Sequence, residues 1–165
     1  MEENKVTETV INTDNIITPD GIPIRVKYHS DTNALKYEGG EEKSNWIDLR
    51  AAEDVELKAG EFKMISLGVS IELPKGYEAY LVPRSSTFKN YGILQTNGIG
   101  IIDTSYCSDE DIWKMPVYAT RDTVIKKNDR IAQFRIFERQ PRLNFVPTYS
   151  LGNESRGGFG SSGKV

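Results

Sequence analysis

The alternation of apolar and polar residues predicts a strand over residues 65–73. Its apolar positions are Ile65, Leu67, Val69, Ile71 and Leu73. Period two is typical of a strand with one buried face. Pro74-Lys75-Gly76 then supplies a turn signal, and a second extended run covers residues 77–82. We therefore expect these two runs to pair as a β-hairpin.

Most of the remaining pattern also has strand character. The shorter candidates are residues 24–28, 55–57, 99–102, 117–119 and 131–137, and a turn signal at residues 126–129 precedes the last of them. Only residues 86–91 have helical character, with Ser85 or Ser86 as the expected cap and Gly92 as the expected end. Many short strands separated by turns indicate an all-β sandwich or barrel.

The two ends of the chain differ from its middle. Residues 1–20 are rich in Asn, Thr, Asp and Glu, and we expect a loose arm or an additional edge strand. Residues 151–165 are glycine-rich and have no core pattern, so we expect a flexible C-terminal arm. Residues 21–150 would then form a single β-barrel domain.

Composition excludes several classes of function. The 165 residues include 21 Lys and Arg against 24 Asp and Glu, a formal net charge of −3, so we expect no binding to a nucleic-acid backbone. No run of 18 apolar residues exists, so we expect no membrane partner. The first residues lack the features of a signal peptide, and Cys107 is the only cysteine. These features together favour the cytoplasm.

Two side chains that often catalyse reactions are poor candidates here. His29 is the only histidine and has no evident Ser or Asp partner, so we expect a structural or surface role. Cys107 precedes the acidic segment 108–111, and nearby negative charge raises the pKa of a thiol. The acidic segment itself is typical of a solvated loop.

Two other segments have the composition of phosphate sites. Arg84, Ser85 and Ser86 lie between a predicted strand and the helical turn, where a guanidinium, hydroxyls and free amides can converge on an anion. An ordinary helix cap with an exposed arginine is the alternative. The run from Arg156 to Gly163 offers glycine amides and hydroxyls, and its Phe159 can stack on a base, although such a run is often only a linker.

A third segment, residues 97–106, combines a turn pair with an acid and a tyrosine. Asn97-Gly98 predicts a hairpin turn, and the apolar run after it leads to Asp103 and Tyr106. An aspartate in this place can act as a general base on a water molecule, and a hairpin backbone offers fixed donors and acceptors to a base edge. A structural hairpin with Asp103 capping a turn is the alternative.

These three segments occur with two more, Asp48-Leu49-Arg50-Ala51 and residues 128–133. In this order the five resemble the five motifs of the trimeric dUTP diphosphatase (dUTPase) family, in the form found in Gram-positive bacteria and their phages. The resemblance covers residues 46–163, and Asp103 lies six positions after Asn97 and three before Tyr106. Any single motif is weak evidence, whereas five in order are specific.

The resemblance implies an all-β jelly-roll or barrel-like fold and a homotrimer with active sites at subunit interfaces. It implies that dUTP is hydrolysed to dUMP and pyrophosphate with Mg²⁺ as cofactor, which limits uracil in DNA and supplies dUMP for dTMP synthesis. Asp103 matches the aspartate that activates the water attacking the α-phosphate. Asp48 matches the acid that holds a water molecule on the magnesium ion.

The same resemblance implies a set of substrate-binding residues. Asn97, Gly98 and the backbone through Ile102 match the segment that reads uracil, and Tyr106 matches the residue that packs under deoxyribose. The matches to phosphate-contacting positions are Arg84, Ser85, Ser86 and Gln133. The matches to the mobile C-terminal arm, which closes over uracil and the γ-phosphate, are Arg156, Phe159, Gly160, Ser161 and Ser162.

The sequence departs from the family pattern in three places. Asn45-Trp46-Ile47 precedes Asp48 where Ala-Gly is usual, residues 107–110 replace the usual Gly-Glu or Gly-Gln after the tyrosine, and Asn128 replaces a glycine. Asparagine tolerates the same left-handed turn, so we expect little effect at that position. We expect Phe159 to stack on uracil, with Trp113, which lies near the changed segment, as a second candidate for that role.

Two alternatives remain at this point. dCTP deaminase is similar in fold and has an Arg-Ser-Ser segment, but this sequence combines Asp103, Tyr106 and the glycine-rich arm. Some phage dUTPases resemble regulatory switches that bind a repressor-type protein in a dUTP-dependent way. For that function, residues 1–20 and 108–111 would be the surfaces to examine.

Overall fold

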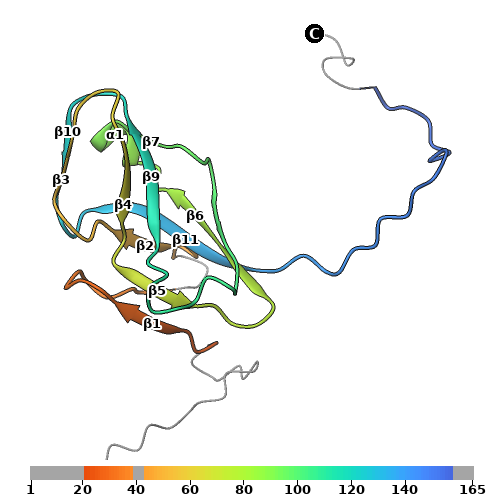
Figure 1. Cartoon of the computed structure of the whole chain (residues 1–165), viewed down its shortest axis with the longest axis horizontal. Helices are drawn as coiled ribbons and strands as arrows, with labels where there is room; N and C mark the ends of the chain where they lie inside the picture. Colours follow the sequence, from red (N-terminus) through yellow and green to blue (C-terminus); the bar gives the residue numbers. More distant parts are fainter. Residues whose placement is uncertain (1–20, 39–42, 158–165) are drawn as a thin grey trace, which may run out of the picture.

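The computed structural model describes residues 21–38 and 43–157 and is almost entirely β-structure (Figure 1). The expectation of an all-β fold is therefore confirmed. The described residues form eleven strands and one helix: β1 (Arg25–Tyr28), β2 (Ile47–Arg50), β3 (Val55–Leu57), β4 (Phe62–Ser66), β5 (Val69–Glu72), β6 (Tyr77–Pro83), α1 (Thr87–Tyr91), β7 (Ile93–Gln95), β8 (Gly100–Ile102), β9 (Lys114–Ala119), β10 (Thr123–Ile125) and β11 (Arg130–Glu138).

The strands form four small antiparallel sheets. Their orders are β2-β11-β6-β8, β4-β9-β7, β1-β5 and β10-β3. β11 and β6 make the longest ladder, from Ala132 opposite Pro83 to Glu138 opposite Tyr77. On its other edge β11 pairs with β2, and the register shifts between Arg130 and Ala132. Such a bulge re-aims side chains locally, and here it lies beside the candidate site described below.

The inward faces of these sheets form one hydrophobic core. Large side chains from distant segments are completely enclosed in it, including Leu49, Ile65, Leu81, Trp113 and Ile131. Burial of this apolar surface is the main driving force that holds the short strands together. The strands β2, β6 and β11, which position the candidate residues Asp48, Arg84 and Gln133, each contribute buried side chains to this core.

The period-two pattern of residues 65–73 correctly predicts which residues are buried, but these residues form two strands rather than the single predicted strand. All five apolar positions are buried, but the stretch is divided at Leu67-Gly68 into β4 and β5. Gly68 has a φ of 68°, a left-handed conformation that suits glycine. Ser70, at a polar position of the pattern, is also buried, because its hydroxyl is hydrogen-bonded to His29 and to the carbonyl of Asp109.

The two predicted hairpins are wrong. The turn at Pro74-Lys75-Gly76 exists, but β5 pairs with β1, while both edges of β6 are taken by β11 and β8. Likewise, the turn at Asn97-Gly98 joins β7, which pairs with β9, to β8, which pairs with β6. Both turns therefore carry the chain from one sheet to another, and this places residues 97–102 at a boundary between sheets.

The helical turn is confirmed, but its cap differs from the expected one. Gly92 ends α1 in the left-handed conformation, as predicted, while Ser86 makes no side-chain capping bond. Instead, the buried Thr87 hydroxyl accepts a hydrogen bond from the Arg84 amide (3.0 Å) and donates one to the Ile131 carbonyl (2.8 Å). This pair of bonds fixes the turn that carries Arg84 against β11.

The chain leaves the strands after β11. Every residue from 139 to 157 is exposed, and this segment extends away from the sheets in Figure 1. Among the residues that the structure describes, no helix is long and apolar enough to cross a membrane.

Candidate active site

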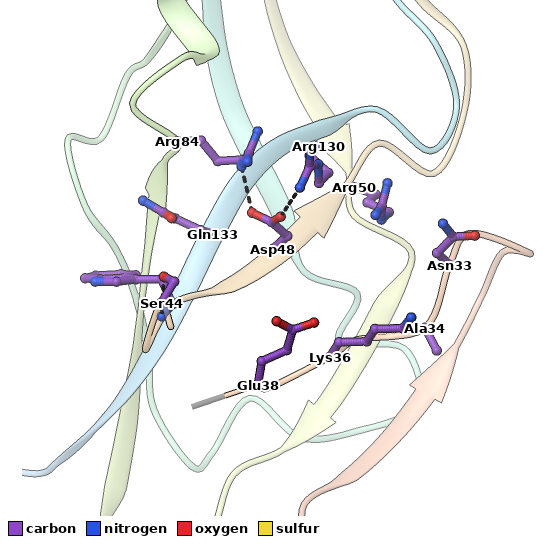
Figure 2. Close-up of a pocket in the computed structure, with 11 residues that line it drawn as sticks. Asn33, Ala34, Lys36, Glu38, Ser44, Asp48, Arg50, Arg84, Arg130 and Gln133 are labelled. Atoms are coloured by element: carbon purple, nitrogen blue, oxygen red, sulfur yellow. Dashed lines mark hydrogen bonds and ion pairs between the residues drawn. The ribbon is translucent and has the colours of Figure 1, made fainter. Parts of the chain in front are cut away.

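The first candidate hollow is built around Asp48 on β2. Its carboxylate oxygens accept hydrogen bonds from two arginines: Oδ1 from Arg84 Nε at 2.6 Å, and Oδ2 from Arg130 Nη1 at 3.0 Å (Figure 2). Arg84 follows β6 and Arg130 begins β11, so three segments distant in the sequence meet here. The hollow has a volume of about 390 Å³ and is lined by Asn33, Ala34, Lys36, Glu38, Ser44, Trp46, Asp48, Arg50, Arg84, Arg130 and Gln133.

The electrostatics of this hollow suit a phosphate chain. Its lining contributes four cationic side chains against two carboxylates, and charge-assisted bonds from arginine are strong donors to phosphate oxygens. The ion pairs with Asp48 hold both guanidinium groups in place before a ligand arrives. Gln133 lies directly opposite Asp48 in the β2-β11 ladder, and its Nε2 donates to the Pro83 carbonyl at 3.4 Å.

The second candidate hollow contains Asn97, Asp103 and Tyr106. It also has a volume of about 390 Å³, and its walls are mostly apolar. A flat base and a deoxyribose need this combination of apolar walls and a few polar groups. The lining residues are Met64, Leu81, Asn97, Gly100, Ile101, Ile102, Asp103, Ser105, Tyr106, Ile112, Trp113, Lys114 and Pro116.

Asp103 is held as a carboxylate with one oxygen available. The Ser105 hydroxyl and the Ser105 amide both donate to Oδ1. These two bonds lower the pKa of Asp103 below its usual value, the hydroxyl bond having the larger effect, so the group is ionised at neutral pH. The Tyr106 amide contributes a smaller lowering of this pKa, and no side chain that the structure describes donates a hydrogen bond to Oδ2, so this oxygen can accept one from a water molecule.

Glycine and tyrosine shape the rest of this hollow. A Cβ atom at Gly100 would lie 3.2 Å from the Leu81 side chain, so glycine lets β8 approach β6 closely. Gly98 has a φ of 68°, which the turn requires. The Tyr106 hydroxyl donates to the Ile112 carbonyl at 3.2 Å and fixes the ring at the mouth of the hollow.

The structure thus divides the predicted site residues between two places. Asp103, Asn97, Ile102 and Tyr106 line the second hollow, whereas the first holds Asp48, Arg84 and Gln133, and the two hollows share no lining residue. Ser85 and Ser86 lie in the turn after Arg84, and Gly98 lies in the turn after Asn97. None of these three residues lines either hollow. Arg156 is exposed in the extended C-terminal segment, while Phe159, Gly160, Ser161 and Ser162 lie outside the described residues.

Trp113 is not placed to stack on a ligand as a lid. Its side chain is 1% exposed and packs edge to face against Phe134, with 5.1 Å between ring centroids. It therefore forms the floor of the second hollow and belongs to the core. Its indole Nε1 is buried and has no hydrogen-bond partner among the residues that the structure describes.

The residues rejected as catalytic from the sequence have structural contacts or lie at the surface. His29 Nε2 is 2.9 Å from the Ser70 hydroxyl, and Cys107 is exposed. Residues 108–110 of the acidic segment are exposed as expected, whereas Asp111 is half-buried. The segment is also tied to β1, because Lys27 Nζ lies 2.7 Å from an Asp109 carboxylate oxygen. This ion pair lowers the pKa of Asp109.

Sequence reasoning missed part of the first hollow. Arg130 was recognised only as part of a motif, and Lys36, Trp46 and Arg50 were not considered as site residues. The register of β11 against β2 places Arg130 opposite Arg50 and Gln133 opposite Asp48. Only that register, which no local pattern shows, could have identified Arg130 as the second partner of Asp48.

Comparison with known proteins gives consistent results. The sequence model of the dUTPase family matches residues 38–163. The prophage-derived deoxyuridine 5'-triphosphate nucleotidohydrolase YosS of Bacillus subtilis is 54% identical over 142 residues, covering 85% of this chain and 97% of that protein. A deoxyuridine 5'-triphosphate nucleotidohydrolase of Leifsonia xyli is 39% identical, covering 70% of this chain and 77% of that protein.

Solved structures show the same fold. The dUTPase of Streptococcus mutans aligns with a TM-score of 0.62 at 22% identity, over 72% of this chain and 98% of that chain. A dUTPase mutant from phage phi11 of Staphylococcus aureus aligns with a TM-score of 0.65 at 18% identity, over 77% of this chain and 98% of that chain. On the family match and the identity to curated relatives together, this chain belongs to the dUTPase family.

Proposed function

We propose that this chain, as a member of the dUTPase family, hydrolyses dUTP to dUMP and pyrophosphate with Asp103 as the general base. The observation that carries the proposal is the state of the Asp103 carboxylate. It is ionised and oriented by Ser105, it keeps one oxygen open, and it shares a hollow with Asn97 and Tyr106. A charged, positioned carboxylate can accept the proton of an attacking water molecule.

The second hollow would hold the nucleoside part of the substrate. In this proposal Asn97 and the backbone up to Ile102 contact the uracil edge and Tyr106 packs under deoxyribose, which their shared place in the lining of this hollow supports. The adjacent apolar walls exclude water from the ring faces. Asp103 then lies on the exposed side of the same hollow, where the α-phosphate of a bound nucleotide would begin.

The first hollow would hold the phosphate chain. Attack by water at the α-phosphorus increases negative charge on the phosphoryl oxygens, and fixed cationic donors stabilise that charge. Arg84 and Gln133 are the proposed contacts, with Ser85 and Ser86 in the adjoining turn, and Arg130 completes the arginine pair. Because Asp48 already orients both guanidinium groups, little rearrangement is needed on binding.

The residues of the first hollow fit a magnesium ion carried by the substrate. Magnesium in such sites is usually held by phosphate oxygens and water with one or two carboxylates, and Asp48 is the carboxylate at hand. Each of its oxygens accepts one arginine bond and retains a lone pair for a metal-bound water molecule. When bound, Mg²⁺ would neutralise phosphate charge. The structure of the phage phi11 dUTPase mutant is described as containing a structural Mg(II) ion.

A homotrimer would bring the two hollows together from different chains. The sheet β4-β9-β7 supports this arrangement, because the strand registers place the exposed side chains of Phe62, Met64, Leu94 and Tyr118 on one face. Met64 also lines the second hollow, so this apolar face is continuous with the nucleoside site. Burial of the face against another copy would join the nucleoside hollow of one chain to the phosphate hollow of its neighbour.

The C-terminal segment would complete the site. We propose that residues 151–165 form an arm that closes over bound nucleotide. In this arm Arg156, Ser161 and Ser162 would contact phosphate, and Phe159 and Gly160 would lie over uracil. The exposed, extended course of residues 139–157 supports an arm that reaches another subunit. We place the reaction in the cytoplasm of a bacterium or of a phage-infected host.

The two alternatives receive no specific support. Structures of phage 80alpha dUTPase variants are described in connection with control of virulence-gene transfer, but that description concerns those proteins, which share under 25% identity with this chain. The curated relatives are named as dUTP nucleotidohydrolases rather than as deaminases. We therefore propose neither a repressor partner nor deamination for this chain.

Pyrophosphate release from dUTP, UTP, dCTP and dTTP, each with Mg²⁺ and with chelator, tests the proposal. We expect fast release from dUTP alone, and only with Mg²⁺. Release from UTP at a similar rate would contradict the role of Tyr106 in sugar selection. Absence of release from dUTP would contradict the proposed function as a whole.

A further inference from the structure

We infer that Gln95 is a positioning residue for base selection, because it holds the amide of Asn97 so that its Nδ2, rather than its Oδ1, faces the base. This inference rests on the proposed function, in which Asn97 contacts uracil. Gln95 is the last residue of β7 and lies behind the nucleoside hollow rather than in its lining.

A backbone carbonyl fixes the orientation of the Gln95 amide. Gln95 Nε2 donates to the Leu81 carbonyl oxygen on β6 at 3.1 Å. A carbonyl can only accept a hydrogen bond, so the amide nitrogen of Gln95, and not its oxygen, must face Leu81. The strand β6 is held on both edges by β11 and β8, so this acceptor does not move.

The second N–H group of Gln95 then fixes Asn97. Gln95 Nε2 also donates to Asn97 Oδ1 at 2.9 Å. The partner is a donor, so Asn97 must present its oxygen to Gln95 and turn its Nδ2 away from it. Asn97 lines the nucleoside hollow together with Asp103 and Tyr106, so the free Nδ2 group is the one that is available to a ligand.

The chemistry of the base makes this orientation selective. Uracil carries an acceptor, O4, at the position where cytosine carries an amino donor. An Asn97 Nδ2 donor can pair with O4, whereas it faces another donor when the base is cytosine. A site that leaves such polar groups unpaired rejects the wrong base strongly. The Leu81 carbonyl thus fixes the orientation of the Gln95 amide, the Gln95 amide fixes that of the Asn97 amide, and Asn97 presents a hydrogen-bond donor to the base.

Stability alone does not account for Gln95 at this position. Its Oε1 is buried and has no hydrogen-bond partner among the residues that the structure describes. A buried, unpaired oxygen is unfavourable, and an apolar side chain of the same length would avoid it. The residue therefore carries a stability cost that is consistent with a role in orienting Asn97.

Binding of α,β-imido-dUTP and α,β-imido-dCTP, measured by calorimetry, tests the inference. Gln95→Met removes the donor and keeps the length of the side chain. We expect the ratio of the two dissociation constants to fall roughly tenfold toward equality, because the freed Asn97 amide can turn its oxygen to cytosine. Thr96→Val, a change in the same turn outside the amide chain, should leave the ratio unchanged.

A double-mutant cycle separates positioning from a structural effect. Asn97→Asp keeps Oδ1 for Gln95 and removes Nδ2, so it should also lower the ratio. If Gln95 acts through Asn97, Gln95→Met in the Asn97→Asp background changes the ratio no further. Additive effects, or equal loss of affinity for both analogues in Gln95→Met, would overturn the inference.

If Gln95→Met does not fold, Gln95→Leu, which also lacks the donor and is smaller, provides the same test. Leucine leaves Asn97 without its hydrogen-bond donor, so the ratio should again fall toward equality, and an unchanged ratio would overturn the inference. The binding ratio is independent of turnover. If the wild-type protein selects uracil but releases no pyrophosphate from dUTP, the proposed hydrolysis is contradicted, while a fall of the binding ratio in Gln95→Met still supports the role of Gln95.

Discussion

At the scale of single residues, two aspartates have opposite roles. Asp48 has both oxygens engaged by arginines and organises cationic donors. Asp103 has both of its bonds on one oxygen and keeps the other open. The difference lies in their neighbours, since two guanidinium groups surround one carboxylate and a single serine supports the other. The first is suited to fixing charge and the second to accepting a proton.

Asp103→Asn should remove turnover and keep binding. Asparagine has nearly the same shape but cannot accept the proton of water, so we expect kcat to fall roughly 10²–10⁴-fold. The dissociation constant for α,β-imido-dUTP should stay within about twofold, because Asp103 contributes no base contact in the proposed site. Stopped-flow release of pyrophosphate and calorimetry measure the two quantities. A parallel loss of binding would mean that Asp103 is structural.

Ser105→Ala should shift the acidic limb of the pH profile upward. The Ser105 hydroxyl is the largest cause of the lowered pKa of Asp103, so its removal raises that pKa toward the ordinary value of 3.8. The active form is the carboxylate, which is lost as the pH falls through the pKa. Plots of kcat/KM against pH should therefore fall at higher pH in the variant than in the wild type. Identical acidic limbs would exclude this hydrogen bond as the cause.

The sequence predicts some of these residues well and others not at all. Asp103 is found because it ends an apolar run after a turn signal, which are local features. Arg130 and Gln95 act through partners 82 and 14 positions away, at Asp48 and Leu81. Such pairs depend on strand register and side-chain direction, which local periodicity does not encode.

At the scale of elements, Gly68 divides one hydrophobic pattern between two sheets. β4 before it pairs with β9, and β5 after it pairs with β1. The alternation of buried residues continues from β4 through Gly68 into β5. The pattern therefore predicts burial correctly, but it cannot show that the two strands pair with different partners. The two predicted turns are likewise present, but the strands on either side of each turn do not pair with each other. The partner of each strand is determined by segments distant in the sequence. The strands β2, β7 and β10 are not among the predicted ones; strands of three or four residues carry so little periodicity that only some of them, such as β3, are found from the pattern.

Gly68→Ala should destabilise the protein more than Gly76→Ala. Both glycines have positive φ, which costs alanine roughly 1–2 kcal/mol. A Cβ at Gly68 would also lie 2.5 Å from Ser30 Oγ and 3.0 Å from Ala52 Cβ, whereas nothing lies within 4 Å of one at Gly76. We therefore expect about 1–3 kcal/mol of additional destabilisation for Gly68→Ala.

Urea unfolding of both glycine variants at one protein concentration measures this difference, because assembly makes apparent stability concentration-dependent. Gly76→Ala is the matched control for backbone strain without crowding. Equal free energies of unfolding for the two variants would show that Ser30 moves away at negligible cost and that the positive φ alone accounts for the glycine between β4 and β5.

At the scale of the whole molecule, the C-terminal segment after β11 lies outside the hydrophobic core, since every described residue from 139 to 157 is exposed. Truncation after Ser150 removes the glycine-rich arm, and none of the described residues that it removes, 151–157, is buried. We expect the melting temperature and the oligomeric state to be unchanged, while kcat/KM for dUTP falls roughly 10²-fold or more, because closure of an arm excludes water and completes a site. Light scattering and pyrophosphate release provide the two readouts. An unchanged rate would show that the arm is only a linker.

The separation of the two hollows predicts that inactive variants rescue each other. Asp103→Asn disables the nucleoside hollow and Arg84→Ala the phosphate hollow, so each variant alone should be inactive. Suppose that one site takes Asp103 from one chain and Arg84 from its neighbour. In a mixed trimer, such a site is intact when the chain that supplies Asp103 is the Arg84→Ala variant and the chain that supplies Arg84 is the Asp103→Asn variant. Random mixing in equal amounts makes about a quarter of all sites intact. Co-refolding the two variants from urea should therefore restore about 25% of wild-type activity per site, whereas a site contained in one chain gives no activity at any mixing ratio.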